Sequence, residues 1–278
     1  MSIMKNALRD FAVCLKSEDR SPGTVRKYLH DAAEFSAWLG SRKLNKENAA
    51  AWREHLVKKG CAPATINSML SAVNSLFRFL GREDCKIKFL RVQRKAFREQ
   101  DRELTRAEYQ RLLDTAAAEG QERLGLLMET ICSTGIRVSE VQYITVEAVR
   151  AGRAEISLKG KIRTILLPAK LCRKLLKYAR KNKTASGEIF LTGSGKPVSR
   201  KQIWREMKAL CKKAGVESSK VFPHNLRHLF ATVFYKACRD IVKLADVLGH
   251  SSINTTRIYL MTTGAEHARQ LERLGLVT

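Results

Sequence analysis

The residues best suited to chemistry lie in three short segments of the last third of the chain. These are HNLRH at 224–228, GHSS at 249–252 and TTRIYL at 255–260. An imidazole titrates near neutral pH and suits acid–base work, and an arginine fork matches the oxygens of a phosphate. His224 and Arg227 are three residues apart, so they share one face of a helix. Two further cations precede them, Arg137 within TGIRVSE and Lys159 within KGK.

Each of these residues also has a structural interpretation when taken alone. A tyrosine within a helix is usually part of a core, and an arginine near a bend can cap a helix. His224 and His228 have a zinc-compatible spacing, but the glutamate of HExxH is absent and no cysteine lies nearby, so we expect no metal site. The sequence also lacks a GK[ST] phosphate loop, the acidic cluster of a two-metal nuclease and a GxSxG hydrolase motif.

The segments around Arg137 and Lys159 must present these side chains at bends. Gly135 is expected to end a helix, which would place Arg137 just beyond that end. Residues 153–167 alternate in polarity on both sides of KGK, which predicts a β-hairpin with Lys159 and Lys161 at its turn.

The rest of the second half is predicted to be mostly helical. Thr105 and Glu108 form a capping-box pattern at the first helix start. A short strand is expected at 189–191. The helices expected are 105–118, 122–133, 168–182, 199–214, 224–238, 240–248 and 252–262.

Residues 1–81 predict a small helical domain. Apolar residues recur at helical spacing, and short turns join four helices into a bundle. The helices expected are 3–18, 25–39, 45–60 and 63–81. Polar side chains near the helix starts are candidates for phosphate contacts, although each can equally be a cap or a solvated side chain. These candidates are Thr24, Arg26, Lys27, Thr65 and Asn67.

Residues 82–103 are rich in basic side chains and weak in periodicity. We interpret them as a linker between a DNA-binding domain at 1–81 and a second domain at 104–278. A charge run is usually just solvated, but one that joins two basic domains is at least as well placed to cross a nucleic-acid backbone. Arg94 and Lys95 are the candidates for that contact.

Composition narrows the class of partner. The 278 residues include 52 Lys and Arg against 27 Asp and Glu, a formal charge of +25 that both halves share. Because 44% of the residues are hydrophobic, the chain can bury a core and is not a disordered basic tail. Such folded domains usually neutralise a polyanion, and a basic surface kept for solubility is the alternative. The seven scattered cysteines and the lack of an apolar signal region predict a reduced, intracellular protein.

The motifs taken together, in order, are far more specific than any one of them. TGIRVSE, the KGK hairpin, HNLRH, LGHSS and TTRIYL resemble the tyrosine recombinases, also called the phage-integrase family. The segments SPGTVRKYLHD and APATINSMLSAVNSLFRFL are similar to that family's core-binding domain, so the resemblance covers nearly the whole chain. It implies a mainly α fold with a small β-sheet, made of an N-terminal four-helix SAM-like core-binding domain and a C-terminal α+β catalytic domain. The catalytic residues it implies are Arg137, Lys159, His224, Arg227, His250 and Tyr259.

The resemblance implies site-specific DNA strand exchange through a 3′-phosphotyrosyl intermediate, with neither metal, ATP nor another cofactor. Tyr259 would attack the phosphodiester, and Arg137 and Arg227 would hold its non-bridging oxygens. His250 would be a further donor to the phosphate, and His224 would be the acid–base group near the tyrosine.

Four further residues have expected roles. Lys159 would protonate the departing 5′-oxygen, and Lys161 is a weaker rival for that role as well as a candidate DNA contact. Glu140 either orients Arg137 or merely closes a salt bridge. His228 is expected to be structural.

The expected partners are double-stranded DNA and copies of the same chain in a tetramer on paired sites, with an accessory protein or partner recombinase also conceivable. The chain starts at the core-binding domain, which resembles the short Xer-type enzymes or small mobile-element integrases, and a cytoplasmic, nucleoid-associated location is expected. An apolar stripe formed by Ala265, Ala268, Leu271, Leu274 and Leu276 either joins its own core or docks on a neighbouring protomer. Two alternatives stay open: a DNA-binding protein of this fold without strand transfer, and a type IB topoisomerase-like nicking-closing enzyme.

Overall fold

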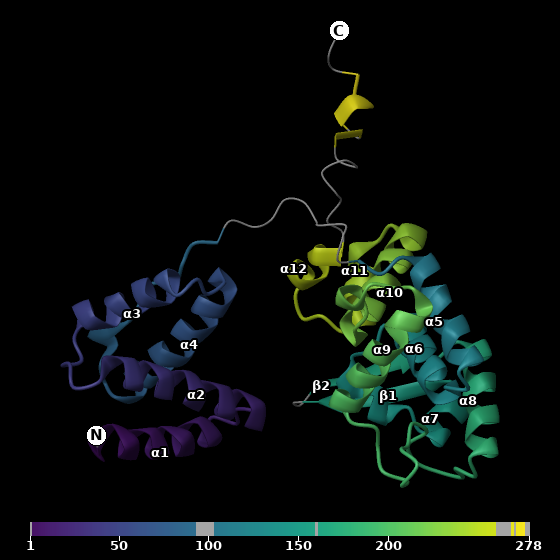
Figure 1. Ribbon diagram of the computed structural model, residues 1–278, viewed down its shortest axis with the longest axis horizontal. Helices are drawn as coiled ribbons and strands as arrows, with labels where there is room; N and C mark the ends of the chain where they lie inside the picture. The colour runs from purple at the N-terminus through teal and green to yellow at the C-terminus, as the bar shows by residue number, and fades with distance from the viewer. Residues whose placement is uncertain (1, 93–102, 159–160, 260–267, 270, 276–278) are drawn as a thin grey trace. The chain divides into compact units, whose positions relative to one another are not determined.

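Each helix of the first unit begins where the sequence marks a helix start. The computed structural model describes residues 2–92, 103–158, 161–259, 268–269 and 271–275, and the chain forms two units, residues 1–94 and 95–278 (Figure 1). The helices of the first unit are α1 (Ser2–Ser17), α2 (Pro22–Leu39), α3 (Lys46–Lys58) and α4 (Pro63–Phe79). Both α2 and α4 start with proline, whose fixed φ suits the first helical position.

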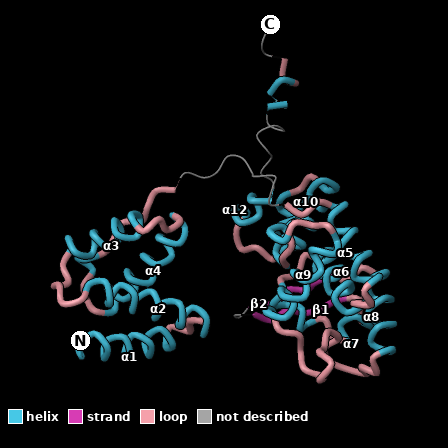
Figure 2. Tube along the Cα trace, in the orientation of Figure 1, coloured by secondary structure: helices cyan, strands magenta, loops and turns pink. Residues whose placement is uncertain are grey.

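The core of the first unit is built around aromatic rings. The ring of Phe35 meets Phe77 edge-on at 5.3 Å and Trp52 at 5.8 Å between centroids. Such edge-to-face pairs add to the free energy gained by burying apolar area. Three of the four helices, α2, α3 and α4, thereby share one core, which confirms the helical bundle expected from the sequence (Figure 2).

The segment after α4 differs from the predicted linker. A short 3-10 helix spans Glu83–Cys85, and Cys85 and Ile87 are buried in the core of the first unit. Asn74 exchanges two hydrogen bonds of 2.9 Å with the backbone of Ile87, and Asn67 likewise holds Leu90 at 2.8 and 3.0 Å. The first unit therefore extends beyond residue 81, because Cys85 and Ile87 pack inward and Asn67 and Asn74 hold the backbone of this segment.

The second unit places a small sheet beside a layer of helices (Figure 2). Strands β1 (Arg153–Leu158) and β2 (Lys161–Leu166) pair antiparallel, with Ile156 opposite Arg163. Its longer helices are α5 (Arg106–Ala118), α6 (Glu122–Thr134), α8 (Ala169–Lys181), α9 (Arg200–Ala214) and α10 (Pro223–Cys238), followed by α11 (Ile241–Leu248) and α12 (Ile253–Thr256). Helices α6 and α10 pack against each other, as do α5 and α9. The capping box predicted for α5 is present, with Thr105 and Glu108 satisfying each other's backbone N–H groups.

The second unit differs from the sequence-based prediction in three places. Residues 138–150 form a 3-10 helix (Val138–Tyr143) and the short helix α7 (Val146–Arg150), which are too brief to show a helical period in the sequence. Where a strand is expected at 189–191, Leu191 forms one isolated bridge with Pro197. The helix expected at 252–262 is α12 followed by a 3-10 turn at Arg257–Tyr259, and residues 260–262 lie outside the described residues.

Gly135 joins α6 to the segment that bears Arg137, as the sequence predicts. Its φ of +66° lies in the left-handed region that side chains avoid. A Cβ atom there would lie 2.4 Å from the ring of Phe230 on α10 and 3.1 Å from Leu248 on α11. Both backbone conformation and close packing therefore require glycine at this point.

We predict that Gly135→Ala destabilises the second unit more than Gly215→Ala does. Gly215 ends α9 with a φ of +59° but has open space where a Cβ would go. The left-handed conformation alone costs about 1–2 kcal/mol, and overpacking against Phe230 adds about 1–3 kcal/mol. Urea denaturation of both variants measures the difference, and equal losses would contradict the packing argument.

Candidate active site

Arg227 lies at the centre of the candidate site. It is carried by α10, and the residue is only 2% exposed. Its guanidinium donates hydrogen bonds to the carbonyl oxygen of Gly135, to that of Leu248 at 2.8 Å and to Nε2 of His250 at 3.0 Å. One buried side chain therefore binds two other segments of the second unit, the one at Gly135 and the one at 248–250.

The two carbonyl groups that Arg227 binds belong to helix ends. Gly135 caps the C-terminus of α6, and Leu248 is the last residue of α11. The last carbonyls of a helix have no partner within it and carry the negative end of its dipole, so a guanidinium suits this position. Arg137 follows Gly135 by two residues and His250 follows Leu248 by two. The contacts of Arg227 thus fix the start of both functional segments.

His250 is held on both sides of its ring. Because arginine can only donate, Nε2 of His250 must accept the bond from Arg227, which leaves the ring proton on Nδ1. Nδ1 lies 2.8 Å from the hydroxyl of Thr256, a fully buried residue of α12. Burial, followed by the charges of Arg227, Arg137 and Arg163, lowers the pKa of His250 to about 4. The imidazole is therefore neutral at physiological pH.

Tyr259 is packed against three imidazole rings. The residue is 3% exposed and belongs to the 3-10 turn after α12. Its ring lies parallel to that of His250 at 5.9 Å, edge-on to His228 at 4.8 Å and tilted against His224 at 6.3 Å between centroids. The structure therefore brings Tyr259 together with His224 and His250. It also places His228, which was expected to be structural, in direct contact with the tyrosine.

Arg137 is anchored by a buried carboxylate. Glu140, which is 1% exposed, accepts the backbone N–H of Arg137 at 2.7 Å and its guanidinium at 2.9 Å. The side chain of Arg137 nevertheless stays 42% exposed, so its remaining donors can reach a ligand. Glu140 therefore does more than close a salt bridge, because the same contacts orient Arg137.

The cations make the site strongly electropositive. Burial and then the charge of Arg137 lower the pKa of Arg227, while hydrogen bonding to Tyr259 acts in the opposite direction. Burial, Arg227 and Arg137 likewise lower the pKa of His224, so this imidazole is a neutral base. A neutral base beside a tyrosine, with guanidinium groups around it, suits attack on an anionic phosphodiester.

Two family models together match most of the sequence. Residues 102–266 match the phage integrase family, and residues 8–84 match the N-terminal SAM-like domain of phage integrases. The chain belongs to the phage integrase family.

Curated relatives of this phage integrase extend over most of its length. The tyrosine recombinase XerA of Thermococcus kodakarensis is 30% identical, covering 98% of this chain and 96% of that protein. The tyrosine recombinase XerD of Agrobacterium fabrum is 29% identical, covering 85% of this chain and 83% of that one.

Solved structures share the fold of this integrase. The XerH site-specific recombinase bound to a palindromic difH substrate has a TM-score of 0.73 at 20% identity, covering 95% of this chain and 82% of that one. A lambda integrase dimer bound to a COC′ core site also has a TM-score of 0.73, at 18% identity, covering 94% and 96%. The expected fold class, with a SAM-like domain and an α+β catalytic domain, is thereby confirmed.

Not every predicted residue can be placed in the integrase site. Lys159 lies outside the described residues, as do Arg94 and Lys95. Lys161 begins β2, where its backbone pairs with Leu158 at the end of the hairpin.

The candidate DNA contacts of the first unit have different surroundings. Thr24 hydrogen-bonds Ser21 at the start of α2, and Lys27 forms an ion pair with the buried Asp31. Arg26 and Thr65 are exposed. Asn67 uses its amide to hold Leu90, so its described contacts are structural.

Three further residues shape the site: Thr256 and Arg163, for which the sequence predicts no role, and His228, which is expected only to be structural. Thr256 lies three residues before Tyr259. A small polar side chain at this position only weakly indicates the buried hydrogen bond that it makes with His250. Arg163 follows the KGK turn and binds Glu140. His228 belongs to the HNLRH motif, but its contact with Tyr259 depends on how α12 packs against α10.

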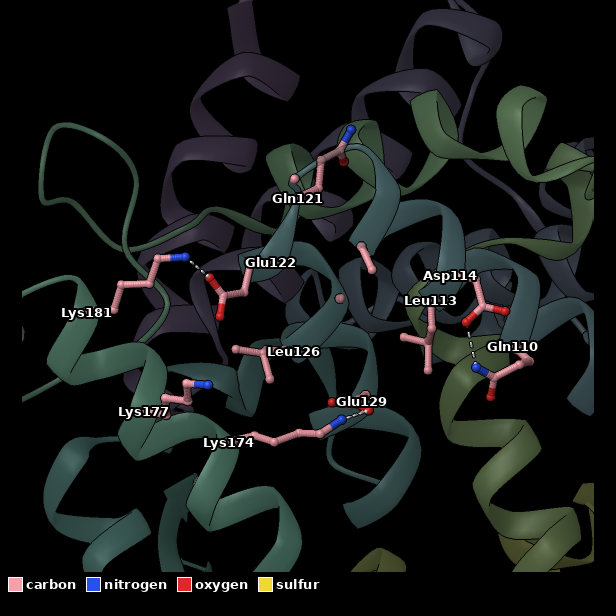
Figure 3. A pocket seen from close by; sticks show the side chains of 13 residues that line it. Gln110, Leu113, Asp114, Gln121, Glu122, Leu126, Glu129, Lys174, Lys177 and Lys181 are labelled. Carbon is pink, nitrogen blue, oxygen red and sulfur yellow. Dashed lines mark hydrogen bonds and ion pairs between the residues drawn. The ribbon is translucent and has the colours of Figure 1, made fainter.

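Figure 3 shows a cleft of the second unit that these residues do not line. It measures about 620 Å³ and lies between α5, α6 and α8. Its charged groups pair with one another, Lys174 with Glu129 at 2.5 Å and Lys181 with Glu122 at 2.7 Å. None of the candidate catalytic residues lines it. In the described part of the chain, no group of three or more His, Cys, Asp or Glu is placed to hold a metal ion, and no helix is long and apolar enough to span a membrane.

We predict that His250 titrates near pH 4 in the folded protein, well below its ordinary value of 6.5. As the pH falls, the unfolded chain takes up this proton first, so the contribution of neutral His250 to stability is complete above about pH 6.5 and is lost towards about pH 4. Proton NMR titration, with the resonance assigned through His250→Asn, measures the midpoint. A midpoint at the ordinary value would show that Arg227 and burial do not act on this ring.

Proposed function

We propose that this tyrosine recombinase exchanges strands of double-stranded DNA at specific sites, with Tyr259 as its nucleophile. The observation that carries the proposal is the convergence of Arg137, His224, His250 and Tyr259 around the buried Arg227. These residues come from separate segments of the chain, and their types match one reaction at a phosphodiester.

The cleavage step breaks one phosphodiester bond and forms another. The Tyr259 oxygen attacks phosphorus and joins the 3′-phosphate, while the bond to the 5′-oxygen breaks. His224 takes the proton of the tyrosine, and Lys159 gives a proton to the departing 5′-oxygen. Attack by the 5′-hydroxyl of another strand reverses the step and frees the tyrosine. Because each bond is replaced by one of similar energy, the exchange needs no ATP.

The arginines stabilise the charge that grows on the non-bridging oxygens. Arg137 offers its exposed donors, and a bound phosphate competes with His250 for Nη2 of Arg227. Once that nitrogen is released, His250 can adopt its other neutral tautomer, in which Nδ1 accepts a hydrogen bond from the Thr256 hydroxyl and the N–H at Nε2 donates one to the phosphate. Removal of a single donor of this kind typically lowers the rate of an enzyme about 10²–10³-fold.

Assembly on DNA completes the proposal. A lambda integrase tetramer has been solved bound to a Holliday junction, and we assign this chain the same kind of tetramer on paired sites. Within the C-terminal stripe, the apolar side chains of Ala268, Leu271 and Leu274 are exposed. This favours docking of the stripe on a neighbouring protomer. We further assign the protein to the cytoplasm, in association with the nucleoid.

Trapping on a nicked suicide substrate tests the nucleophile. The natural chain should form a covalent DNA adduct in the presence of EDTA, and Tyr259→Phe should form none, because it lacks the attacking oxygen. Tyr235→Phe is the matched control, since this tyrosine of α10 packs against the same small cluster and should leave the adduct unchanged. Denaturing gels measure the yield.

The outcomes of that experiment separate the alternatives. An adduct with Tyr259→Phe overturns the assignment of the nucleophile. Specific DNA binding without any adduct identifies a DNA-binding protein that performs no strand transfer. An adduct that rejoins only its own strand, with no recombinant product between two sites, identifies a topoisomerase-like enzyme.

We predict that Arg26→Ala weakens DNA binding mainly by removing one phosphate contact. The slope of log K against log salt concentration should then fall by about one. Asn67→Ala is the contrasting variant, since losing its bonds to Leu90 should lower the free energy of unfolding by about 1–3 kcal/mol and leave the slope unchanged. Filter binding over a salt series measures the slopes, and an unchanged slope for Arg26→Ala would remove this residue from the DNA interface.

A further inference from the structure

Arg163 is a half-buried cation for which the reaction proposed above has no use. It lies on β2, and its neighbours Ile162 and Thr164 point outward and are exposed, whereas Arg163 turns inward on the same face as the buried Ile165. Its side chain is 17% exposed, and its Nε is buried without a hydrogen-bond partner. A buried charge of this kind is expensive unless its contacts compensate.

The contacts of Arg163 are with the supports of catalytic residues. One nitrogen forms an ion pair with Oε2 of Glu140, the carboxylate that anchors Arg137. Its other terminal nitrogen lies 3.4 Å from the carbonyl oxygen of Val247, near the end of α11. Its stem runs so close to Gly249 that a Cβ there would lie 2.5 Å from Cδ of Arg163. Gly249 is the residue immediately before His250.

We propose that Arg163 is a positioning residue that locks β2 to both Glu140 and the turn before His250, and so sets Arg137 and His250 relative to each other. The proposal rests on the proposed function only where cleavage is measured. Arg227 joins the same two segments from the α10 side, and Arg163 joins them from the sheet side. The guanidinium groups of Arg227 and Arg163 thereby hold the same two segments, one from α10 and the other from β2.

The chemistry of the side chain explains why arginine fits this position. A guanidinium fork can bind a carboxylate with one arm and reach a carbonyl group with the other. A lysine has a single ammonium group, which can hold Glu140 but cannot also follow the surface of Gly249 to Val247. Glu140 in turn carries two arginines on one carboxylate, so losing Arg163 frees it to rotate and to carry Arg137 with it.

Single-turnover cleavage at saturating protein concentration tests the proposal. Arg163→Met should slow cleavage about 10–100-fold, as expected for a misplaced catalytic group, with DNA affinity unchanged. Arg163→Lys should recover part of the rate. The matched control is Arg153→Met, which removes the same charge from the exposed face of β1 in the same hairpin and should cleave normally.

A double-variant cycle shows whether Arg163 acts through Arg137. In an Arg137→Lys background, the further loss caused by Arg163→Met should shrink several-fold, because the group that it positions is already altered. Fully additive losses, an equal defect in Arg153→Met, or a natural rate for Arg163→Lys would each overturn the proposal. The comparison of Arg163→Lys with the natural chain tests the proposal even when Arg163→Met does not fold.

A second readout needs no cleavage. The cations and imidazole that face His250 are Arg227 and His224 from α10, Arg137 from the segment after α6, and Arg163 from β2. In the DNA-free protein, the NMR midpoint of His250 should rise in Arg163→Met and stay in place in Arg153→Met. An unshifted midpoint overturns the proposal, whereas a shifted midpoint with no Tyr259-dependent adduct in the natural chain overturns only the proposed function.

Discussion

A buried guanidinium that binds the ends of two helices is the interaction on which the rest of the site depends. Removing a cation from water is unfavourable, and Arg227 is stable in the interior because it meets the free carbonyl groups and negative dipole ends of α6 and α11. The same side chain that would bind phosphate therefore also determines where Arg137 and His250 begin. Its binding and structural roles are inseparable, since the donors that hold the helix ends belong to the group that faces the site.

The surplus of positive charge around Arg227 has a second consequence. Arg137 and Arg163 share the buried carboxylate of Glu140, whereas Arg227 binds two backbone carbonyl groups and His250. Burial, together with the charge of the cations, lowers the pKa of both neighbouring imidazoles, so that His224 is a neutral base and His250 can accept a hydrogen bond. An incoming phosphate supplies the negative charge that this arrangement lacks. The site is thus preorganised for an anion before any DNA arrives.

The C-terminal boundary of the first unit differs from the one that the sequence pattern predicts. A run of basic residues after α4 indicated a linker from residue 82, yet Cys85 and Ile87 fill the aromatic core and two asparagines bind the backbone beside them. Apolar alternation over so few residues is hidden by intervening lysines. Asn67 was a candidate phosphate contact for its type and its place near a helix start, and only its bonds to Leu90 reveal a structural use.

The sequence by itself determined the helices with strong apolar periods, the hairpin, the bend at Gly135 and the family, because local spacing and ordered motifs carry that information. It also named the three histidines whose rings pack against Tyr259, namely His224, His228 and His250. The tertiary structure alone decided that His228 contacts the tyrosine, that Thr256 orients His250 and that Arg163 supports Glu140. Those contacts join residues that are distant in the chain, and they depend on how α10, α11, α12 and β2 pack. No local pattern of residue types encodes that packing.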